Sequence, residues 1–265
     1  MQLDNAVAVV TGASAGIGRA TALELARNGA DVIVAARRED RLKELALEIQ
    51  RRGSRAFPVA CDVADREQVE GLKESVEREV GRCDVLINNA GVPGGGPFDQ
   101  MAIEDIERVT RINYFGVLYC TKAFLPMMLE QGRGHIVNVG SLAGRYAVPG
   151  ASVYTATKHA VIAFSEALYH EVRPKGVLVT AVNPGLVRTE QFPHRDASDR
   201  IVMPPQRIAK VIVDVLRTGK APEVSVPRWL ASLQAFRVLT PPLYRWGIKR
   251  ASERGLRATR AGGED

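Results

Sequence analysis

Tyr154 and Lys158 lie four residues apart in "VYTATKHAV" (153–161), a stretch that otherwise consists mainly of small or apolar residues. If this stretch is helical, both side chains lie on one face and can reach one site. A phenol with a pKa of about 10 is a poor base at neutral pH, but a nearby ammonium group favours the phenolate. Because pairs at this spacing also occur by chance, the pair predicts proton transfer only if the rest of the chain supplies a reaction.

A glycine-rich stretch near the start of the chain, "TGASAGIG" (11–18), directly follows the apolar run "AVAVVTG" (6–12). Glycines at a turn from strand to helix let the backbone approach a pyrophosphate, and the helix N-terminus offers free N–H groups to the anion. A simple tight connection is the alternative. The position after the first strand-like run favours dinucleotide binding.

The end of the second strand-like run, "DVIVAA" (31–36), bears on the choice of dinucleotide because Arg37 and Arg38 follow it. A carboxylate at that end would select NAD, whereas an arginine would accept the 2′-phosphate of NADP. Asp31 lies at the opposite end, about 16 Å away at ~3.3 Å per residue. Arg37, assisted by Arg38 and Ser14, therefore favours NADP(H), while NAD(H) stays open. The alternative role, at the start of a solvated helix, fits Arg38 better than Arg37.

Apolar runs alternate with segments of helical periodicity along most of the chain. The predicted strands lie within 6–12, 31–36, 56–63, 83–91, 135–141, 177–185 and 223–227. The predicted helices cover about 16–28, 39–52, 65–80, 102–130, 152–172 and 207–217. Strands that are apolar on both faces and separated by helices indicate a parallel sheet covered on both sides. The sequence thus predicts an α/β, Rossmann-like, doubly wound sheet of seven parallel strands.

Further motifs follow in order and match those of a known family. "CDV" (61–63) contains Asp62, "NNAG" (88–91) follows one strand-like run, and "NPG" (183–185) follows another. Four more residues match that family's catalytic tetrad, namely Asn113, Ser141, Tyr154 and Lys158. Together with the glycine loop, this series resembles the short-chain dehydrogenase/reductase family from residue 5 to about residue 227.

The resemblance implies a role for each residue of the tetrad. Tyr154 would protonate the substrate oxygen as a hydride arrives from the nicotinamide, or remove that proton in the oxidative direction. Ser141 would hydrogen-bond the carbonyl, Lys158 would hold the nicotinamide ribose, and Asn113 would hold a water that links Lys158 to solvent. Each residue also has a structural alternative: Tyr154 as a core ring, Lys158 as a lysine that reaches the surface, Ser141 as a helix cap and Asn113 as a helix irregularity. All four alternatives holding together is improbable.

The resemblance also implies a set of cofactor and substrate contacts. The cofactor residues are Gly12, Ser14, Gly16, Ile17, Gly18, Arg37, Arg38, Asp62, Val63, Asn89, Ala90, Gly91, Tyr154, Lys158, Pro184, Gly185, Val187 and Thr189. The candidates for the substrate pocket are Leu142, Ala143, Arg145, Val148 and His194. The other three histidines are interpreted as structural or surface groups. The identity of the substrate stays open.

Composition and charge bound the remaining possibilities. The 265 residues are 46% apolar and 25% charged, as in a soluble protein, and no run free of charged residues exceeds 14 residues. Three cysteines without metal-ligand spacing, and the lack of a signal-peptide pattern, favour a reduced cytoplasmic protein without a metal. Residues 228–260 contain eight basic residues and one acidic residue, so this stretch alone accounts for the net charge of +6 and the remainder is about neutral.

We therefore predict one dinucleotide-binding catalytic domain, 1–227, and a basic, partly apolar extension, 228–265. The extension is expected to pack on the core or on a neighbouring subunit; contact with an anionic membrane is the less favoured alternative. No element for reading nucleic acid accompanies its charge. The resemblance implies a homotetramer or homodimer formed through 102–130 and 152–172. The predicted function is NADP(H)-dependent interconversion of a carbonyl, possibly lipophilic in character, and a secondary alcohol; an NAD-dependent alcohol dehydrogenase and a catalytically silent nucleotide-binding regulator are the alternatives.

Overall fold

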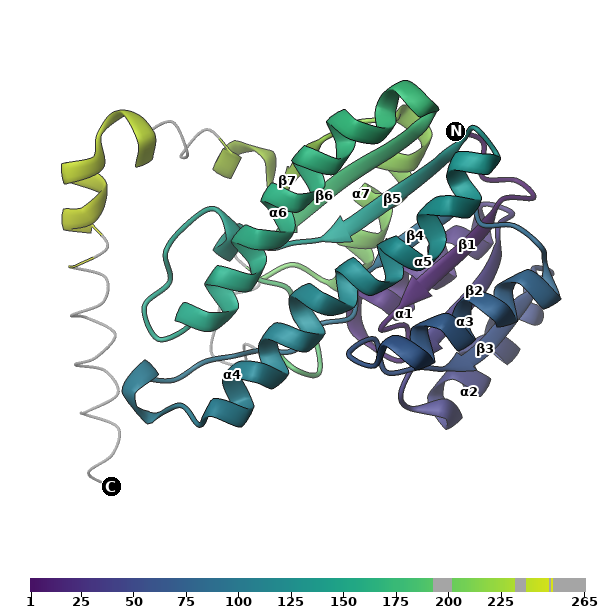
Figure 1. Cartoon of the computed structure of the whole chain (residues 1–265), viewed down its shortest axis with the longest axis horizontal. Coiled ribbons are helices and arrows are strands. Elements are labelled where there is room, and N and C mark those ends of the chain that lie inside the picture. The colour runs from purple at the N-terminus through teal and green to yellow at the C-terminus, as the bar shows by residue number, and fades with distance from the viewer. Residues whose placement is uncertain (193–201, 232–236, 248, 250–265) are drawn as a thin grey trace.

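Seven parallel strands form one sheet in the order β3-β2-β1-β4-β5-β6-β7 (Figure 1). The computed structural model describes residues 1–192, 202–231, 237–247 and 249. The strands are β1 Val7–Thr11, β2 Asp31–Ala36, β3 Ala56–Ala60, β4 Val85–Asn88, β5 Gly134–Val139, β6 Val177–Pro184 and β7 Glu223–Val226. The predicted Rossmann-like fold with a seven-stranded parallel sheet is confirmed.

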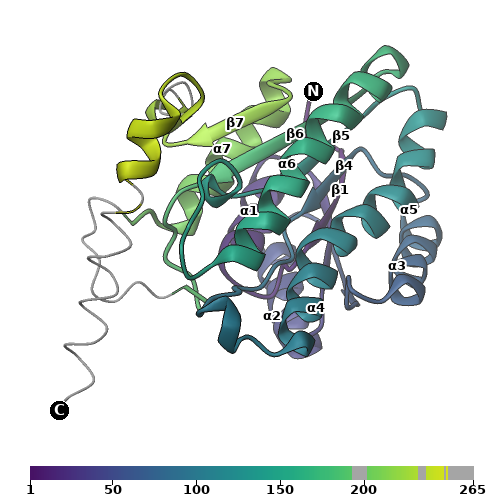
Figure 2. The same cartoon turned by 60° about the vertical axis from the view of Figure 1, so that its left-hand side comes forward.

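Helices cover both faces of this sheet, as Figures 1 and 2 show. One face is covered by α1 (Gly16–Arg27), α2 (Glu39–Gln50) and α7 (Pro205–Thr218). The other is covered by α3 (Arg66–Glu79), α4 (Ile103–Thr110), α5 (Gly116–Glu130) and α6 (Ser152–Val172). Successive residues of β1 alternate between these two cores, since Ala8 and Val10 belong to the first and Val7 and Val9 to the second. Burial on both faces explains why the strands are continuously apolar.

The segment predicted as one helix over about 102–130 is interrupted. Regular α-helix occupies Ile103–Thr110 and Gly116–Glu130, and a π-helical turn, Arg111–Phe115, lies between them. In a π-turn the N–H of residue i+5 donates to the carbonyl of residue i, and such turns are frequent at functional sites. The difference from the prediction matters because Asn113 lies in this turn.

The described part of the basic extension contacts the core through polar groups. Arg237 donates hydrogen bonds to the carbonyl oxygen of Arg145 and to His159 Nε2, the latter at 3.1 Å. The amide of Ala147 donates to the Tyr244 hydroxyl at 3.1 Å. Apolar side chains nearby stay exposed, and Leu239 is 77% accessible. Residues 237 and 244 thus contact the core through hydrogen bonds, whereas the sequence led us to expect apolar packing.

Candidate functional site

The carboxyl ends of the central strands bring the glycine loop, residues 88–91, Ser141 and residues 183–185 to one edge of the sheet. This edge is where doubly wound folds bind their ligands. In the glycine loop, Gly12 and Gly16 have φ values of +64° and +54°. A Cβ added at Gly18 would collide with the carbonyl oxygen of Gly12 and with the side-chain amide of Asn89. The backbone thus needs glycine here, and it leaves a surface close enough for a pyrophosphate to approach.

Thr11 and Asn89 fasten the glycine loop to the end of β4. The Thr11 hydroxyl accepts hydrogen bonds from the amides of Asn89 (3.0 Å) and Ala90 (3.2 Å) and donates to the Ile87 carbonyl (3.2 Å). The Asn89 side chain donates to the Thr11 carbonyl at 3.0 Å. These bonds fix two predicted cofactor segments relative to each other. Thr11 was not among the predicted site residues, although a threonine at the end of an apolar strand could have indicated a polar contact there.

A buried polar network crosses the sheet below the site and includes Asn88 of the "NNAG" motif. Asn88 Nδ2 donates to Thr121 Oγ1 (3.1 Å) and to Asn138 Oδ1 (2.8 Å), and Asn138 Nδ2 donates to Ser165 Oγ (2.8 Å). The network joins β4 and β5 to helices α5 and α6. It thereby fixes the helix that carries Tyr154 and Lys158 against the strands that lead into the site.

Asn113 holds the backbone of Val92 with both ends of its side-chain amide. Its Oδ1 accepts from the Val92 amide at 2.8 Å, and its Nδ2 donates to the Val92 carbonyl at 2.9 Å. Asn113 is fully buried. A Cβ on Gly91 would lie 3.3 Å from Asn113 Oδ1 and 3.7 Å from Lys158 Nζ, so Gly91 lies beside both groups. The π-turn thus places Asn113 beside Gly91, which Lys158 also borders.

Ser141, Tyr154 and Lys158 lie together at the start of α6. The Lys158 ammonium lies 5.8 Å from the centroid of the Tyr154 ring and donates to the Val139 carbonyl at 2.9 Å. Ser141 Oγ accepts from the Ala143 amide at 3.1 Å, and the Ser141 side chain hydrogen-bonds Tyr154. The sequence spacing of four residues therefore produces the predicted shared face, close to the predicted serine.

Burial acts in opposite directions on the two titratable groups. It lowers the pKa of Lys158 to about 8, because the ammonium is removed from water. It raises the pKa of Tyr154, and the hydrogen bond from Ser141 offsets only part of that increase. Desolvation thus favours the protonated phenol at neutral pH. The effect of the Lys158 ammonium on the phenolate, which the sequence argument expected, stays a prediction.

The two arginines after β2 differ in what they contact. Arg38 reaches the glycine loop, because its Nε and Nη2 donate to Ser14 Oγ at 3.2 Å and 3.1 Å. Arg37 turns toward Asp62, 3.7 Å away. Arg38 is also the residue before α2 and makes no side-chain capping bond there. The sequence argument gave Arg37 the main role in binding the 2′-phosphate, whereas Arg38 is the one that contacts Ser14. Which of the two binds the phosphate stays a prediction.

The candidate substrate residues do not all lie together. Leu142 and Ala143 are half-buried in a 3-10 turn after Ser141, and Val148 is exposed. The Arg145 guanidinium donates to Glu223 of β7, with Nε to Oε1 at 2.9 Å, so it is directed to that strand. His194 lies outside the described residues. Phe192, which no motif indicated, has its ring centroid 6.0 Å from that of Tyr154.

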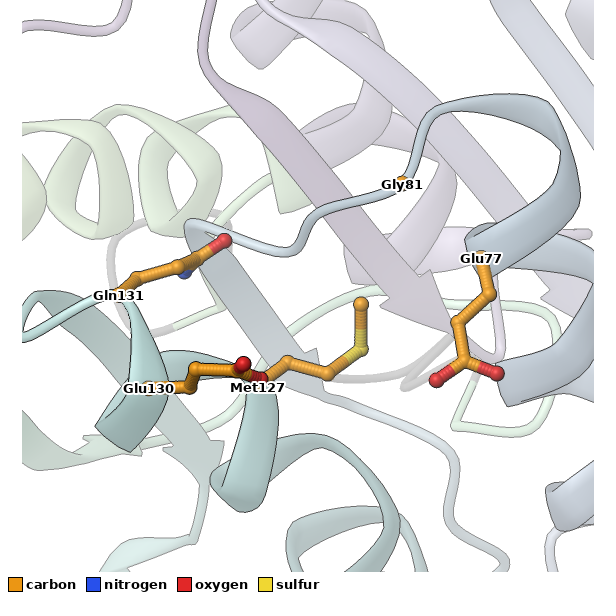
Figure 3. Close-up of a pocket in the computed structure, with 5 residues that line it drawn as sticks. All are labelled: Glu77, Gly81, Met127, Glu130 and Gln131. Carbon is orange, nitrogen blue, oxygen red and sulfur yellow. The ribbon is translucent and has the colours of Figure 1, made fainter.

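A surface hollow of about 390 Å³ lies away from these groups (Figure 3). It is lined by Glu77, Gly81, Met127, Glu130 and Gln131, from the ends of α3 and α5 and the turn before β4. These residues lie toward the amino end of β4, whereas residues 88–91 follow its carboxyl end. Among the described residues, no group of three or more His, Cys, Asp or Glu side chains could hold a metal.

Comparison with known proteins gives consistent results. The family model for short chain dehydrogenases matches residues 6–199. The oxidoreductase BOA17 of Botryotinia fuckeliana is 36% identical over 224 residues, which cover 84% of this chain and 81% of that protein. An uncharacterized oxidoreductase of Staphylococcus aureus is 34% identical over 218 residues, covering 82% and 94% of the two chains.

Solved structures agree with this chain in fold. A short-chain dehydrogenase/reductase from Burkholderia phymatum in complex with NAD has a TM-score of 0.83 and 27% identity, covering 92% of this chain and 96% of its own. Actinorhodin polyketide ketoreductase with NADPH has a TM-score of 0.79 and 35% identity, covering 84% and 96%. Both kinds of nicotinamide dinucleotide therefore occur among the structural relatives.

Proposed function

Because the chain belongs to the short-chain dehydrogenase/reductase family, we propose that this NAD(P)-dependent oxidoreductase reduces a carbonyl to a secondary alcohol with NADPH. Tyr154 is the proton donor in this proposal. The observation that carries it is the close arrangement of Ser141, Tyr154 and Lys158 beside a glycine loop that has no room for side chains. The cofactor, when bound, supplies the hydride.

The buried residues then divide the remaining work. Tyr154 gives its hydroxyl proton to the substrate oxygen, and Ser141 holds that oxygen by a hydrogen bond. The Lys158 ammonium binds the cofactor ribose and lies close enough to stabilise the phenolate that remains. Asn113 positions Val92, and the second lone pair of its Oδ1 is available for the water that would connect Lys158 to solvent.

The protonated state of Tyr154 is the one from which carbonyl reduction starts. A residue that donates a proton must hold one at neutral pH, and burial raises the pKa of this phenol. The phenolate left after the transfer needs the neighbouring Lys158 ammonium for stabilisation, because burial alone disfavours it.

NADP(H) is the cofactor that the basic groups beside the glycine loop support. The 2′-phosphate would bind Arg38, with Ser14 adjacent and Arg37 nearby. The rest of the cofactor would contact the family-motif positions Gly12, Gly16, Ile17, Gly18, Asp62, Val63, Asn89, Ala90, Gly91, Pro184, Gly185, Val187 and Thr189. Leu142, Ala143 and Val148 would shape the substrate pocket.

We also propose that residues 1–227 form the catalytic domain, that 228–265 are an extension of it, and that α4–α5 and α6 mediate a homodimer or homotetramer. Exposed apolar side chains on the first of these segments, Ile103 (64% accessible) and Phe115 (39%), support a contact there. No helix among the described residues has the length and apolar character needed to cross a membrane.

The decisive test replaces Tyr154 with phenylalanine. The expected result is loss of carbonyl reduction with NADPH affinity unchanged, measured by a panel of ketones and by fluorescence titration. Tyr169→Phe, on the same helix, is the matched control and should retain activity. If the wild-type protein binds NADPH but turns over no carbonyl or alcohol, a regulatory nucleotide-binding role replaces the enzymatic one. Turnover by Tyr154→Phe close to that of wild type would remove Tyr154 from the mechanism.

A further inference from the structure

The chain after β6 returns to the glycine loop and places Glu190 beside it. Val187 forms a parallel bridge with Met203, and the Arg188 amide donates to the Met203 carbonyl at 3.0 Å. Two residues further, Thr189 lies so close to Gly16 that a Cβ there would be 3.1 Å from Thr189 Cγ2. Contacts at Val187 and Thr189 thus fix the approach of the neighbouring Glu190 to the outer end of β2.

The Glu190 carboxylate binds two guanidinium groups at that end. Arg41 donates from Nη1 to Oε2 at 2.7 Å and from Nη2 to Oε1 at 3.2 Å. Arg38 donates from Nη1 to both carboxylate oxygens, at 3.0 Å and 3.2 Å. Both arginines lower the pKa of Glu190, so the carboxylate is ionised at neutral pH. The Glu190 carboxylate therefore binds both arginine side chains at the same time.

The same arginines border the place where the adenosine ribose of a dinucleotide would lie. Arg38 holds Ser14 of the glycine loop while it binds Glu190. Arg41 lines a hollow of about 340 Å³ together with Ser14, Ala15, Gly16, Arg19 and Glu44. Phosphate and carboxylate compete for guanidinium groups by the same paired hydrogen bonds. Arg41, which the sequence motifs did not indicate, thus joins Arg38 as a phosphate-binding candidate.

We propose that Glu190 is a cofactor-selectivity residue, whose carboxylate occupies the Arg38–Arg41 pair and must be displaced by the 2′-phosphate of NADP(H). The inference rests on the proposed NADP(H) site. NAD(H) carries hydroxyl groups at this position and need not separate Glu190 from the arginines. Glu190 therefore weakens NADP(H) binding relative to NAD(H), both by holding the two arginines and by repelling a second anion.

The size of the effect follows from the exposure of these groups. The Glu190 side chain is 50% accessible, and Arg38 and Arg41 are 43% and 46% accessible. Ion pairs at such positions are weak individually and are screened by salt. Release of two of them corresponds to an increase of about three- to tenfold in affinity for a 2′-phosphate. The increase should shrink toward unity in about 1 M salt.

The test compares adenosine 2′,5′-bisphosphate with adenosine 5′-monophosphate, which differ only by the 2′-phosphate. Calorimetric titration of the full-length wild-type protein and of Glu190→Gln gives, for each protein, the ratio of its affinity for the bisphosphate to its affinity for the monophosphate. Glu39→Gln is the matched control, since it removes one carboxylate next to Arg38 in the sequence but one that pairs with Lys43 at 2.7 Å. Thermal melting checks that all three proteins are folded.

The expected result is a ratio three- to tenfold higher for Glu190→Gln than for wild type, with an unchanged ratio for Glu39→Gln and unchanged binding of the monophosphate. An unchanged or lower ratio in Glu190→Gln overturns the inference, even if wild type prefers the bisphosphate as the proposed function requires. An equal rise in both variants also overturns it, because general electrostatics would then account for the effect. If wild type shows no preference but Glu190→Gln gains one, the inference stands and the proposed NADP(H) preference fails.

Discussion

Replacing Asn113 with alanine should destabilise the protein as well as impair the site, because this side chain satisfies both backbone groups of Val92. The bonds are 2.8 Å and 2.9 Å long, Asn113 is fully buried, and Val92 is 8% accessible. A buried donor or acceptor that loses its partner costs about 1–3 kcal/mol. Two such groups give a loss of about 2–6 kcal/mol in the free energy of unfolding, and water that enters the vacated space moves the value toward the lower end.

Urea unfolding followed by circular dichroism, at one fixed protein concentration, measures this loss. Thr110→Ala, three residues earlier in the chain, is the control, since it removes one hydrogen bond from a part-buried hydroxyl to the Ile106 carbonyl and should cost about 0.5–1.5 kcal/mol. The Asn113→Ala protein should therefore unfold at a clearly lower urea concentration than Thr110→Ala. Equal midpoints for the two variants would show that the hydrogen bonds from Asn113 to the Val92 backbone do not stabilise the fold, and would leave Asn113 with a role in chemistry alone.

Three further predictions concern His135, Gly18 and the three cysteines. Burial lowers the pKa of His135 from 6.5 to about 3, so between these pH values the unfolded chain binds a proton at His135 and the folded chain does not. The free energy of unfolding should therefore fall by up to about 1.4 kcal/mol per pH unit from pH 6.5 toward 3. Denaturant titrations at several pH values should show a shallower fall for His135→Gln. Gly18→Ala should lose nucleotide binding in fluorescence titrations, since the added methyl group collides with the loop backbone; binding at the wild-type level would contradict that. Burial raises the pKa of Cys61 to about 12 and those of Cys83 and Cys120 further, so a colorimetric thiol reagent should react at pH 8 only after denaturation; rapid reaction of the native protein would show that a thiol is accessible.

Much of the fold could be predicted from the sequence because its strongest patterns are local. Strands buried on both faces are apolar throughout, so their positions and the helices between them can be identified without knowledge of tertiary contacts. Helix α6 begins at Ser152 and ends at Val172, as predicted. The positions of Tyr154 and Lys158 on one face follow from helical geometry alone.

The parts that could not be predicted depend on contacts between distant residues. Glu190 meets Arg38 across 152 positions of the chain, and Arg145 meets Glu223 across 78. No periodicity or spacing encodes such pairs. The direction of the Tyr154 pKa likewise depends on how completely the fold buries the phenol. The contact of Arg38, and not Arg37, with Ser14 could not be predicted either, because side-chain direction after β2 depends on neighbours such as Asp62.

The π-turn at Arg111–Phe115 has a consequence for how this segment tolerates changes in length. One extra residue is accommodated in that turn, and each residue rotates the following side chains by about 100° around the helix axis. Deleting a single residue there would give a more regular helix with better hydrogen bonds. The same deletion would turn α4 and α5 relative to each other, so that Asn113 could no longer face Val92 while Phe124 stays buried against the sheet. A deletion in this segment would thus make the helix more regular but would misplace the side chains that contact the core. Deletions should therefore be tolerated less well than substitutions.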